Sequence, residues 1–373
     1  MVLLSKRRVA GGLFVAALLS ASAGVLAQSA RSPSAPAPAA PPATSVQPPK
    51  AAPDMQMVLD ALAGLGGEPI ETLTPAQARM QPSAADGAKA VMAKKGMSTA
   101  PDPSVDTQDL PYGSDPKQFA RIYRPASAPA GGKPMPVVVY YHGGGWVIAD
   151  VNTYDAAPRA MARALNAIVV SVEYRHAPEF KFPAQHDDAA AAYRWTLQKA
   201  ASWGGDSTRI AVAGESAGGN LAVATAIYAR DNGLTVPRHI VSVYPIANSS
   251  MTLPSRRDSA NAKPLNAAML KWFGYYYQTS ATDAQDPRLN LVAANLRGLP
   301  PTTIINAQID PLRSDGETLA AAMRGAGVKV EQKSFPGVTH EFFGMAAVVR
   351  GARDANDLAV SRLKAAFAVA PRR

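Results

Sequence analysis

The feature that most constrains this chain is the run Gly214-Glu215-Ser216-Ala217-Gly218, which stands between two different sequence patterns. Residues 209–213 are mostly apolar and predict a buried β-strand, while the alanine-rich residues 220–230 predict a helix. A strand that passes directly into a helix must turn sharply at Ser216, so only glycine fits two residues before and two residues after it. A strand, Gly-x-Ser-x-Gly and a helix in this order indicate a nucleophile elbow, which presents a serine hydroxyl at the edge of a sheet.

A second glycine-rich run, His142-Gly143-Gly144-Gly145-Trp146, follows the apolar residues 136–141, which also predict a strand. Three glycines allow backbone N–H groups to face a ligand because no side chain stands in the way. Acyl transfer needs such donors, since its tetrahedral intermediate carries a negative oxygen. A phosphate-binding loop is the alternative, but no Gly-Lys-Ser/Thr follows and the chain has no G-x-G-x-x-G pattern. The two glycine runs together therefore favour nucleophilic catalysis by Ser216.

A serine nucleophile needs a base within hydrogen-bond reach, and in this architecture the acid and then the histidine follow the serine along the chain. Only His239 and His340 follow Ser216. His239 precedes the strand-like residues 240–244, and we interpret it as a surface or packing histidine. His340 follows the strand-like residues 328–335 and a turn, so it leaves the sheet at the same edge as Ser216. His340 is therefore the predicted base.

The acid is expected between Ser216 and His340, where the chain holds several aspartates and glutamates. Asp310 comes directly after the buried-strand pattern of residues 302–308, so it is also predicted at the exit of a strand. Asp315 falls about one turn later, on the following helix, and is the alternative. Because Asp315 suits an N-terminal cap of that helix, we predict that Asp310 is the acid.

With these residues the chain resembles the hormone-sensitive-lipase-like branch of the α/β-hydrolases, a family of bacterial carboxylesterases. The resemblance runs from about Met55 to Phe367 and rests on the two glycine runs and on five further stretches. Those stretches are Tyr123-Arg124-Pro125, Tyr174-Arg175-His176-Ala177-Pro178-Glu179 with Phe182-Pro183-Ala184, Trp203-Gly204-Gly205-Asp206, Asp310-Pro311-Leu312-Arg313 and Gly337-Val338-Thr339-His340-Glu341-Phe342.

The resemblance implies a serine carboxylesterase that hydrolyses short- to medium-chain acyl esters through an acyl-enzyme, without a cofactor. The implied nucleophile, acid and base are Ser216, Asp310 and His340. The implied oxyanion donors are the N–H groups of Gly144, Gly145 and Ala217, with Gly143 as a further candidate. A hydrolase of lactone, amide or peptide bonds on the same triad is the alternative, and a non-catalytic small-molecule-binding protein on this fold is a more distant one.

Where the family more often has Asp and Gly, this chain has Glu215 and Ala149, and the second of these changes leaves the substrate preference open. Residues predicted to line the substrate pocket are His142, Trp146, Glu215, Tyr276 and Phe342. Glu179 is expected to be a structural ion-pair partner, with Arg175 as the candidate on the other side.

Strand-like and helix-like patterns alternate from about residue 119 to residue 367. This alternation predicts an α/β-hydrolase fold, with a mostly parallel central sheet, helices on both faces and a helical cap. The family builds its cap from N-terminal helices, here about residues 55–105, and from an insertion that corresponds to about residues 248–297. Thr74-Pro75-Ala76-Gln77 predicts the start of one of these helices, with Thr74 as its cap.

Residues 1–27 predict a secretory signal peptide, because Lys6, Arg7 and Arg8 precede a short apolar core and small residues precede a cut after Ala27. An uncleaved membrane anchor is the alternative, although the apolar stretch is interrupted and short for a span. The paired arginines leave the export route open, general or twin-arginine. Residues 28–53 are dominated by Pro, Ala and Ser and predict a disordered linker before a hydrolase domain at residues 54–373. We therefore expect an exported protein, periplasmic or secreted, with no stable membrane anchor after leader cleavage.

The formal net charge of +10 includes Lys6, Arg7 and Arg8, so a charge of +7 remains once the leader is removed. The basic residues are scattered and no helix-turn-helix pattern occurs, which argues against a nucleic-acid partner. The absence of cysteine excludes disulfides and a thiol nucleophile. No metal site is expected, because His340-Glu341 lacks the second histidine of a zinc-protease signature. The expected partner is a small-molecule ester. The sequence is compatible with a homodimer. It does not determine the oligomeric state, the physiological ester or the length of the acyl chain.

Overall fold

The computed structural model describes residues 49–127 and 132–369. The predicted signal peptide and most of the predicted linker lie outside these residues. Regular structure begins with helix α1 (Pro53–Gly64), close to the start predicted for the hydrolase domain. Within the described ranges, no helix is both long enough and apolar enough to span a membrane.

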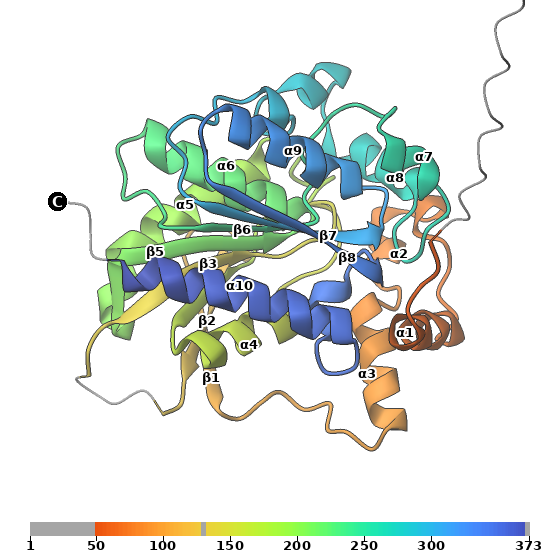
Figure 1. The fold of residues 1–373 in the computed structure, drawn as a ribbon, viewed down its shortest axis with the longest axis horizontal. Helices are drawn as coiled ribbons and strands as arrows, with labels where there is room; N and C mark the ends of the chain where they lie inside the picture. The colour runs from red at the N-terminus through yellow and green to blue at the C-terminus, as the bar shows by residue number, and fades with distance from the viewer. Residues whose placement is uncertain (1–48, 128–131, 370–373) are drawn as a thin grey trace, which may run out of the picture. The chain divides into compact units, whose positions relative to one another are not determined.

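The core of the fold is an eight-stranded sheet with the order β1-β2-β4-β3-β5-β6-β7-β8 (Figure 1). The first two strands run antiparallel to their neighbours, and all other pairs are parallel. This mostly parallel sheet confirms the predicted α/β-hydrolase fold. The strands are β1 (Val105–Pro111), β2 (Phe119–Pro125), β3 (Met135–Tyr141), β4 (Ile168–Val172), β5 (Gly205–Glu215), β6 (Ile240–Val243), β7 (Thr302–Ile309) and β8 (Val330–Thr339).

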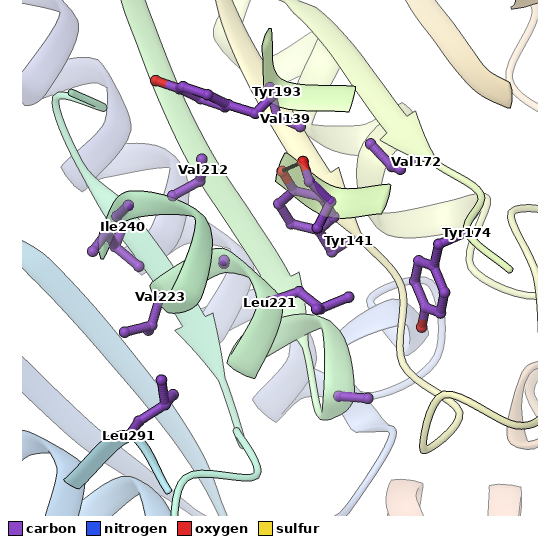
Figure 2. Packing of buried hydrophobic residues seen from close by; sticks show 14 of the residues in the cluster. Val139, Tyr141, Val172, Tyr174, Tyr193, Val212, Leu221, Val223, Ile240 and Leu291 are labelled. Carbon is purple, nitrogen blue, oxygen red and sulfur yellow. Dashed lines mark hydrogen bonds between the residues drawn. The ribbon is translucent and has the colours of Figure 1, made fainter. Parts of the chain in front are cut away.

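Helices cover both faces of the sheet, because alternate residues of each buried strand point to opposite sides. In β3, Val137 and Val139 pack in one apolar cluster with residues of α5 (Ala184–Lys199), α6 (Ala217–Asp231) and α9 (Arg313–Gly325). Val138 and Tyr140 belong to a second cluster with α4 (Ala156–Leu165) and α10 (Arg350–Ala368). Figure 1 shows α4 and α10 on one side of the sheet and α6 and α9 on the other. Figure 2 shows how Leu221 and Val223 of α6 approach Tyr141 and Val212 of the sheet.

The predicted cap segments, about residues 55–105 and 248–297, contain most of the remaining helices. The α-helices are α2 (Pro75–Ala78), α3 (Ala84–Lys94), α7 (Pro254–Asp258) and α8 (Ala267–Tyr277). Short 3₁₀ turns are η1 (Ile70–Thr72), η2 (Ala200–Trp203), η3 (Ala281–Gln285), η4 (Leu291–Ala293) and η5 (Phe342–Met345), of which η2 and η5 lie outside the two segments. The helix start predicted at Thr74 is confirmed, since Thr74 and Gln77 form a reciprocal capping box at α2.

Direct contacts join these two segments to each other. The indole nitrogen of Trp272 in α8 donates a hydrogen bond to the carbonyl oxygen of Leu73 at 2.8 Å. The amide of Asn266, at the start of α8, donates to the Glu71 carboxylate at 2.9 Å. The N-terminal helices and the insertion therefore pack as one group, although about 200 residues separate them along the chain.

A partly exposed ion pair holds the N-terminal helices to the body of the fold. Arg79, which follows α2, donates to the Glu179 carboxylate at 2.6 and 2.8 Å and to the Val147 carbonyl oxygen at 2.8 Å. Glu179 is a structural ion-pair partner, as expected, but the prediction that Arg175 is the other member is wrong. Arg175 instead donates to the buried carboxylate of Asp188 at 2.7 Å. A fully buried carboxylate requires a charged partner more strongly than Glu179, which is half exposed.

Candidate active site

The turn between β5 and α6 places Ser216 in a backbone conformation that side chains rarely adopt, with φ 57° and ψ −117°. The two neighbouring glycines explain how the chain reaches this conformation. A Cβ atom on Gly214 would lie 2.2 Å from the Gly218 carbonyl oxygen, and a Cβ atom on Gly218 would lie 1.9 Å from the carbonyl oxygen of Tyr141. No side chain larger than hydrogen is compatible with either position, so the local geometry is that of a nucleophile elbow.

Ser216, His340 and Asp310 form a continuous chain of hydrogen bonds. The Ser216 Oγ lies 3.0 Å from His340 Nε2, and His340 Nδ1 lies 2.7 Å from Asp310 Oδ2. Asp310 follows the last residue of β7 and His340 follows the last residue of β8, so both emerge at the carboxyl edge of the sheet. All three residues are buried. The second Asp310 oxygen accepts a hydrogen bond from the Leu312 N–H at 2.7 Å, which fixes the orientation of the carboxylate.

The other candidates for the base and the acid, His239 and Asp315, lie away from Ser216 and have other partners. His239 is buried and its Nε2 contacts the Thr303 hydroxyl at 2.9 Å, so it is a packing residue and not a surface one. Asp315 does not cap α9, because it accepts hydrogen bonds from the Ala247 and Asn248 N–H groups, at 3.1 Å each, and pairs with Arg256 at 2.9 Å. Asp315 therefore ties α9 to the chain that follows β6, which a pattern of residue spacing does not reveal.

The glycine loop lies beside Ser216. Gly144 and Gly145 both have positive φ, at 95° and 59°, and Cβ atoms on them would lie 2.0 Å from the Ile148 carbonyl oxygen and 2.3 Å from the Phe273 ring. Neither of their N–H groups, nor that of Ala217, donates a hydrogen bond to any residue in the described part of the chain. Ala217 is also the first residue of α6, where the helix dipole favours negative charge. These N–H groups are thus available to a negative oxygen of a bound molecule.

Gly143 differs from the other two glycines of the loop. A Cβ atom on it would lie 2.2 Å from the hydroxyl oxygen of Tyr154, so Gly143 is required for the close approach of that ring. The φ angle of Gly143 is not positive, unlike those of Gly144 and Gly145. Its role visible in the structure is therefore packing against Tyr154.

Two glutamates stand next to the hydrogen-bonded chain. Glu215 is buried and accepts hydrogen bonds from the hydroxyls of Tyr140 and Tyr244, and burial raises its pKa to about 7 despite those bonds. Glu341 accepts a hydrogen bond from the Tyr154 hydroxyl at 2.7 Å, and its Oε1 lies 3.9 Å from His340 Nε2. Burial also raises the pKa of Glu341. Sequence reasoning missed Glu341 and Tyr154, although the place of Glu341 directly after His340 was an available signal.

The surrounding charges determine the protonation of His340. Burial alone would lower its pKa, but the Asp310 carboxylate raises it, with further contributions from Glu341 and Glu215. The pKa of His340 is therefore above the ordinary value of a histidine. The ring also lies against Tyr244, at 4.4 Å between ring centres. This environment stabilises the protonated form of the imidazole.

Ser216 and His340 open into a cavity of about 450 Å³. Its walls come from the sheet edge, the N-terminal helices and α8, and they are mostly apolar. Apolar residues of the wall include Leu62, Ile70, Leu265, Met269, Leu270 and Phe273. Glu215, Gly144 and Gly145 also line the cavity, together with Tyr154 and Glu341.

Four of the residues predicted to line the pocket do not line this cavity as the structure describes it, and each packs elsewhere. His142 stacks on Tyr174, with 4.3 Å between ring centres, and Trp146 stacks on Tyr277 at 4.2 Å. Tyr276 packs edge-on against Trp272 at 4.8 Å. Phe342 is fully buried against Phe335 and Tyr244. The predicted role of these four rings in the pocket wall is therefore wrong, because each packs against another ring of the fold.

Comparison with known proteins agrees with this geometry. The sequence profile of the alpha/beta hydrolase fold matches residues 138–344. The chain is 38% identical over 294 residues to the carboxylesterase NlhH of Mycobacterium tuberculosis, which covers 76% of this chain and 91% of that protein. An ethyl acetate hydrolase of Pseudomonas putida is 34% identical over 249 residues, or 65% of this chain and 77% of that protein. A hyperthermophilic esterase of the archaeon Pyrobaculum calidifontis superposes with a TM-score of 0.74 at 34% identity, over 86% of this chain and 100% of that one.

The chain belongs to the α/β-hydrolase fold family. Its relatives place it in the hormone-sensitive-lipase-like branch, as the sequence motifs predicted. Because these relatives are carboxylesterases and the solved structures are esterases, the chain is a carboxylic ester hydrolase of the serine type. Its substrate is a small ester.

Proposed function

We propose that the protein hydrolyses esters through a covalent intermediate on Ser216, with His340 as the base and Asp310 as the acid. The observation that carries the proposal is the hydrogen-bonded chain from the Ser216 Oγ through both ring nitrogens of His340 to Asp310, at 3.0 and 2.7 Å. His340 takes the proton of Ser216 as the hydroxyl attacks the ester carbonyl carbon. Asp310 holds the imidazole in the tautomer that leaves Nε2 free to accept that proton.

The proposed reaction passes through two tetrahedral intermediates, one before and one after the acyl-enzyme. In each of them the former carbonyl oxygen carries a negative charge, and the free N–H groups of Gly144, Gly145 and Ala217 are the proposed donors to it. Protonated His340 gives its proton to the leaving alcohol, and the acyl group stays on Ser216. Water, deprotonated by His340, then attacks the acyl-enzyme, and protonated His340 returns the proton to the Ser216 oxygen as its bond to the acyl group breaks and the acid leaves. The raised pKa of His340 supports this scheme, because the imidazolium forms beside the Asp310 carboxylate in both steps.

We propose short- to medium-chain acyl groups as the substrates. The cavity of about 450 Å³ continues from Ser216 between the N-terminal helices and α8, and the side chains along it are mostly apolar. An aliphatic chain gains about 0.8 kcal/mol for each methylene group that it buries there. We propose that the two helical segments form a cap over the site, because Trp272 and Asn266 bond them to each other and both Asn266 and its partner Glu71 line the cavity. A relative that hydrolyses ethyl acetate supports the short end of this range.

We also propose that the protein is exported to the periplasm or secreted. The basic residues, short apolar core and small residues of positions 1–27 support a leader that is removed after Ala27. The Pro- and Ala-rich residues between Ala27 and the start of α1 at Pro53 would then form an N-terminal linker without a membrane anchor. A homodimer is compatible with this proposal, and neither catalysis nor export requires it.

The replacement Ser216→Ala tests the nucleophile. The protein should hydrolyse p-nitrophenyl butyrate, and the variant should lose about 10³-fold or more of kcat, because no other hydroxyl is hydrogen-bonded to the imidazole ring of His340 among the described residues. The fold should remain, since a small side chain replaces another at the same backbone conformation. Circular dichroism and the melting temperature provide the control. Equal activity of the two proteins would exclude Ser216 as the nucleophile.

The pH dependence of kcat/KM tests His340 as the base. The base must be unprotonated to act, and its pKa is raised, so the rate on an uncharged ester should fall as the pH drops through a midpoint above about 6.5. The variant Glu341→Gln removes one carboxylate that raises this pKa, so its midpoint should lie at lower pH than that of the wild type. A wild-type rate that stays constant down to pH of about 5, or a higher midpoint in Glu341→Gln, would contradict this assignment.

The acyl-chain preference tests the assignment of the cavity. Met269→Trp places a larger ring in the cavity wall, so it should lower the ratio of kcat/KM for p-nitrophenyl octanoate to that for the butyrate by about tenfold or more. Tyr275→Trp is the matched control, because Tyr275 lies on the same helix but is 76% exposed. The control should keep the wild-type ratio. A fall of the same size in both variants, or in neither, would mean that the acyl chain lies elsewhere.

A further inference from the structure

A second cluster of polar side chains lies behind the glycine loop and has no part in the proposed reaction. It consists of His142, at the end of β3, and of Glu173 and His176, which follow β4. Glu173 and His142 are fully buried and His176 is 7% exposed. The Nε2 atom of His142 lies 3.6 Å from Glu173 Oε2, and that of His176 lies 3.6 Å from Glu173 Oε1.

The hydrogen bonds of His142 indicate which of its ring nitrogens carries the proton and which has a free lone pair toward the Glu173 carboxylate. Its Nδ1 lies 2.8 Å from the Gly143 carbonyl oxygen, which can only accept a hydrogen bond, and 3.3 Å from the Tyr174 hydroxyl, which can donate to the carbonyl oxygens of His142 and Gly143 instead. We therefore assign the proton to Nδ1. The unprotonated Nε2 therefore points at an oxygen of Glu173. This ring nitrogen and the carboxyl oxygen face each other at 3.6 Å, beyond the length of a hydrogen bond.

Other buried histidines of the chain do not show this arrangement. His186 has partners on both ring nitrogens, Asn220 at 2.9 Å and Tyr277 at 3.1 Å. The Nε2 atom of His239 contacts the Thr303 hydroxyl at 2.9 Å. By contrast, neither Nε2 of His142 nor Nε2 of His176 has a hydrogen-bond partner within the described residues. Buried polar atoms are usually paired, so these two nitrogens are available to a partner of another kind.

We propose that His142, Glu173 and His176 bind a divalent metal ion of the zinc type. Two imidazole nitrogens and one carboxylate are a known ligand set for Zn²⁺, and neutral Nε2 atoms are the donors that it prefers. Ligand atoms around a tetrahedral Zn²⁺ lie about 3.4 Å apart, as bond lengths of about 2.1 Å require. One ligand atom from each of the three residues lies within 4.8 Å of the other two, and each histidine Nε2 lies 3.6 Å from one of the two Glu173 oxygens, so small side-chain movements complete the site.

The surroundings of the cluster suit a bound cation. The bond from His142 Nδ1 to the Gly143 carbonyl is the outer contact that usually orients a metal-bound histidine. Glu173 Oε2 also accepts a hydrogen bond from the Val151 N–H at 3.0 Å, which holds the carboxylate in place. Lys117 lies 3.4 Å from Glu173 Oε1, but its side chain is half exposed and can turn toward water when a metal ion enters.

The bound ion would join two segments that frame the active site. His142 begins the glycine loop, and Glu173 and His176 begin the stretch that pairs with this loop, since the Ala177 N–H donates to the Trp146 carbonyl oxygen at 2.9 Å. The metal would therefore stabilise the loop that carries Gly144 and Gly145 without touching the ester. Residue spacing alone conceals the site, because His142 lies far from the pair Glu173 and His176 in the sequence.

Metal content and thermal stability of the intact protein, purified without a histidine tag, test the proposal. The protein is dialysed against EDTA, then supplied with Zn²⁺ and freed of excess ion by gel filtration. We expect about one Zn²⁺ for each chain by inductively coupled plasma mass spectrometry. We also expect a melting temperature about 5 °C or more above that of the EDTA-treated protein. Co²⁺ in place of Zn²⁺ should give the visible absorption of a four- or five-coordinate site, and Mg²⁺ should change nothing.

Variants locate the ion. His176→Leu should abolish both the bound Zn²⁺ and the rise of the melting temperature. His239→Gln, which changes another buried histidine, should keep both. If His176→Leu does not fold, the Co²⁺ absorption of the wild type and its loss on adding EDTA decide the question. The proposal is overturned if the wild type holds no stoichiometric Zn²⁺ and its melting temperature does not respond, or if folded His176→Leu retains the ion.

Discussion

The carbonyl oxygen of Tyr141, at the end of β3, lies directly against Gly218, at the start of α6. A Cβ atom on Gly218 would lie 1.9 Å from that oxygen, so the contact exists only because the residue is glycine. This approach brings the first turn of α6 over the end of β3, where the glycine loop begins. The hydroxyl of Ser216 and the free N–H groups of Gly144 and Gly145 therefore lie at the same edge of the sheet. The parallel strands β7 and β8 end at this edge too, which brings Asp310 and His340 to Ser216.

Buried carboxylates are numerous around this edge, and each has a different way of being stabilised. Asp310 is hydrogen-bonded to His340, and Asp315 pairs with Arg256. Glu215 has only the hydroxyls of two tyrosines, and burial raises its pKa to about 7. The negative charge that remains near His340 favours the imidazolium form. Such an arrangement lowers the energy of a transition state in which the histidine is protonated, and it costs no reorganisation during the reaction.

The positions of Ser216, Asp310 and His340 at the sheet edge were predictable from sequence, because each follows a strand pattern and parallel strands share one exit edge. Contacts across the fold were not predictable in the same way. Nothing in the sequence distinguishes a ring that lines a cavity from one that stacks behind its wall, as Trp146 does on Tyr277. Likewise the partner of Glu179 is decided by which acids are buried, and burial is a property of the folded chain.

The most direct test of the account is covalent labelling with a p-nitrophenyl phosphonate ester, followed by mass spectrometry of the peptides. Attack by an activated serine displaces p-nitrophenolate and leaves a stable phosphonyl group on the oxygen. The account predicts one label for each chain, on Ser216, and much slower labelling of the variant His340→Ala, in which the serine has lost its base. A label on any other residue, or equal rates of labelling in the two proteins, would contradict the proposed catalytic unit.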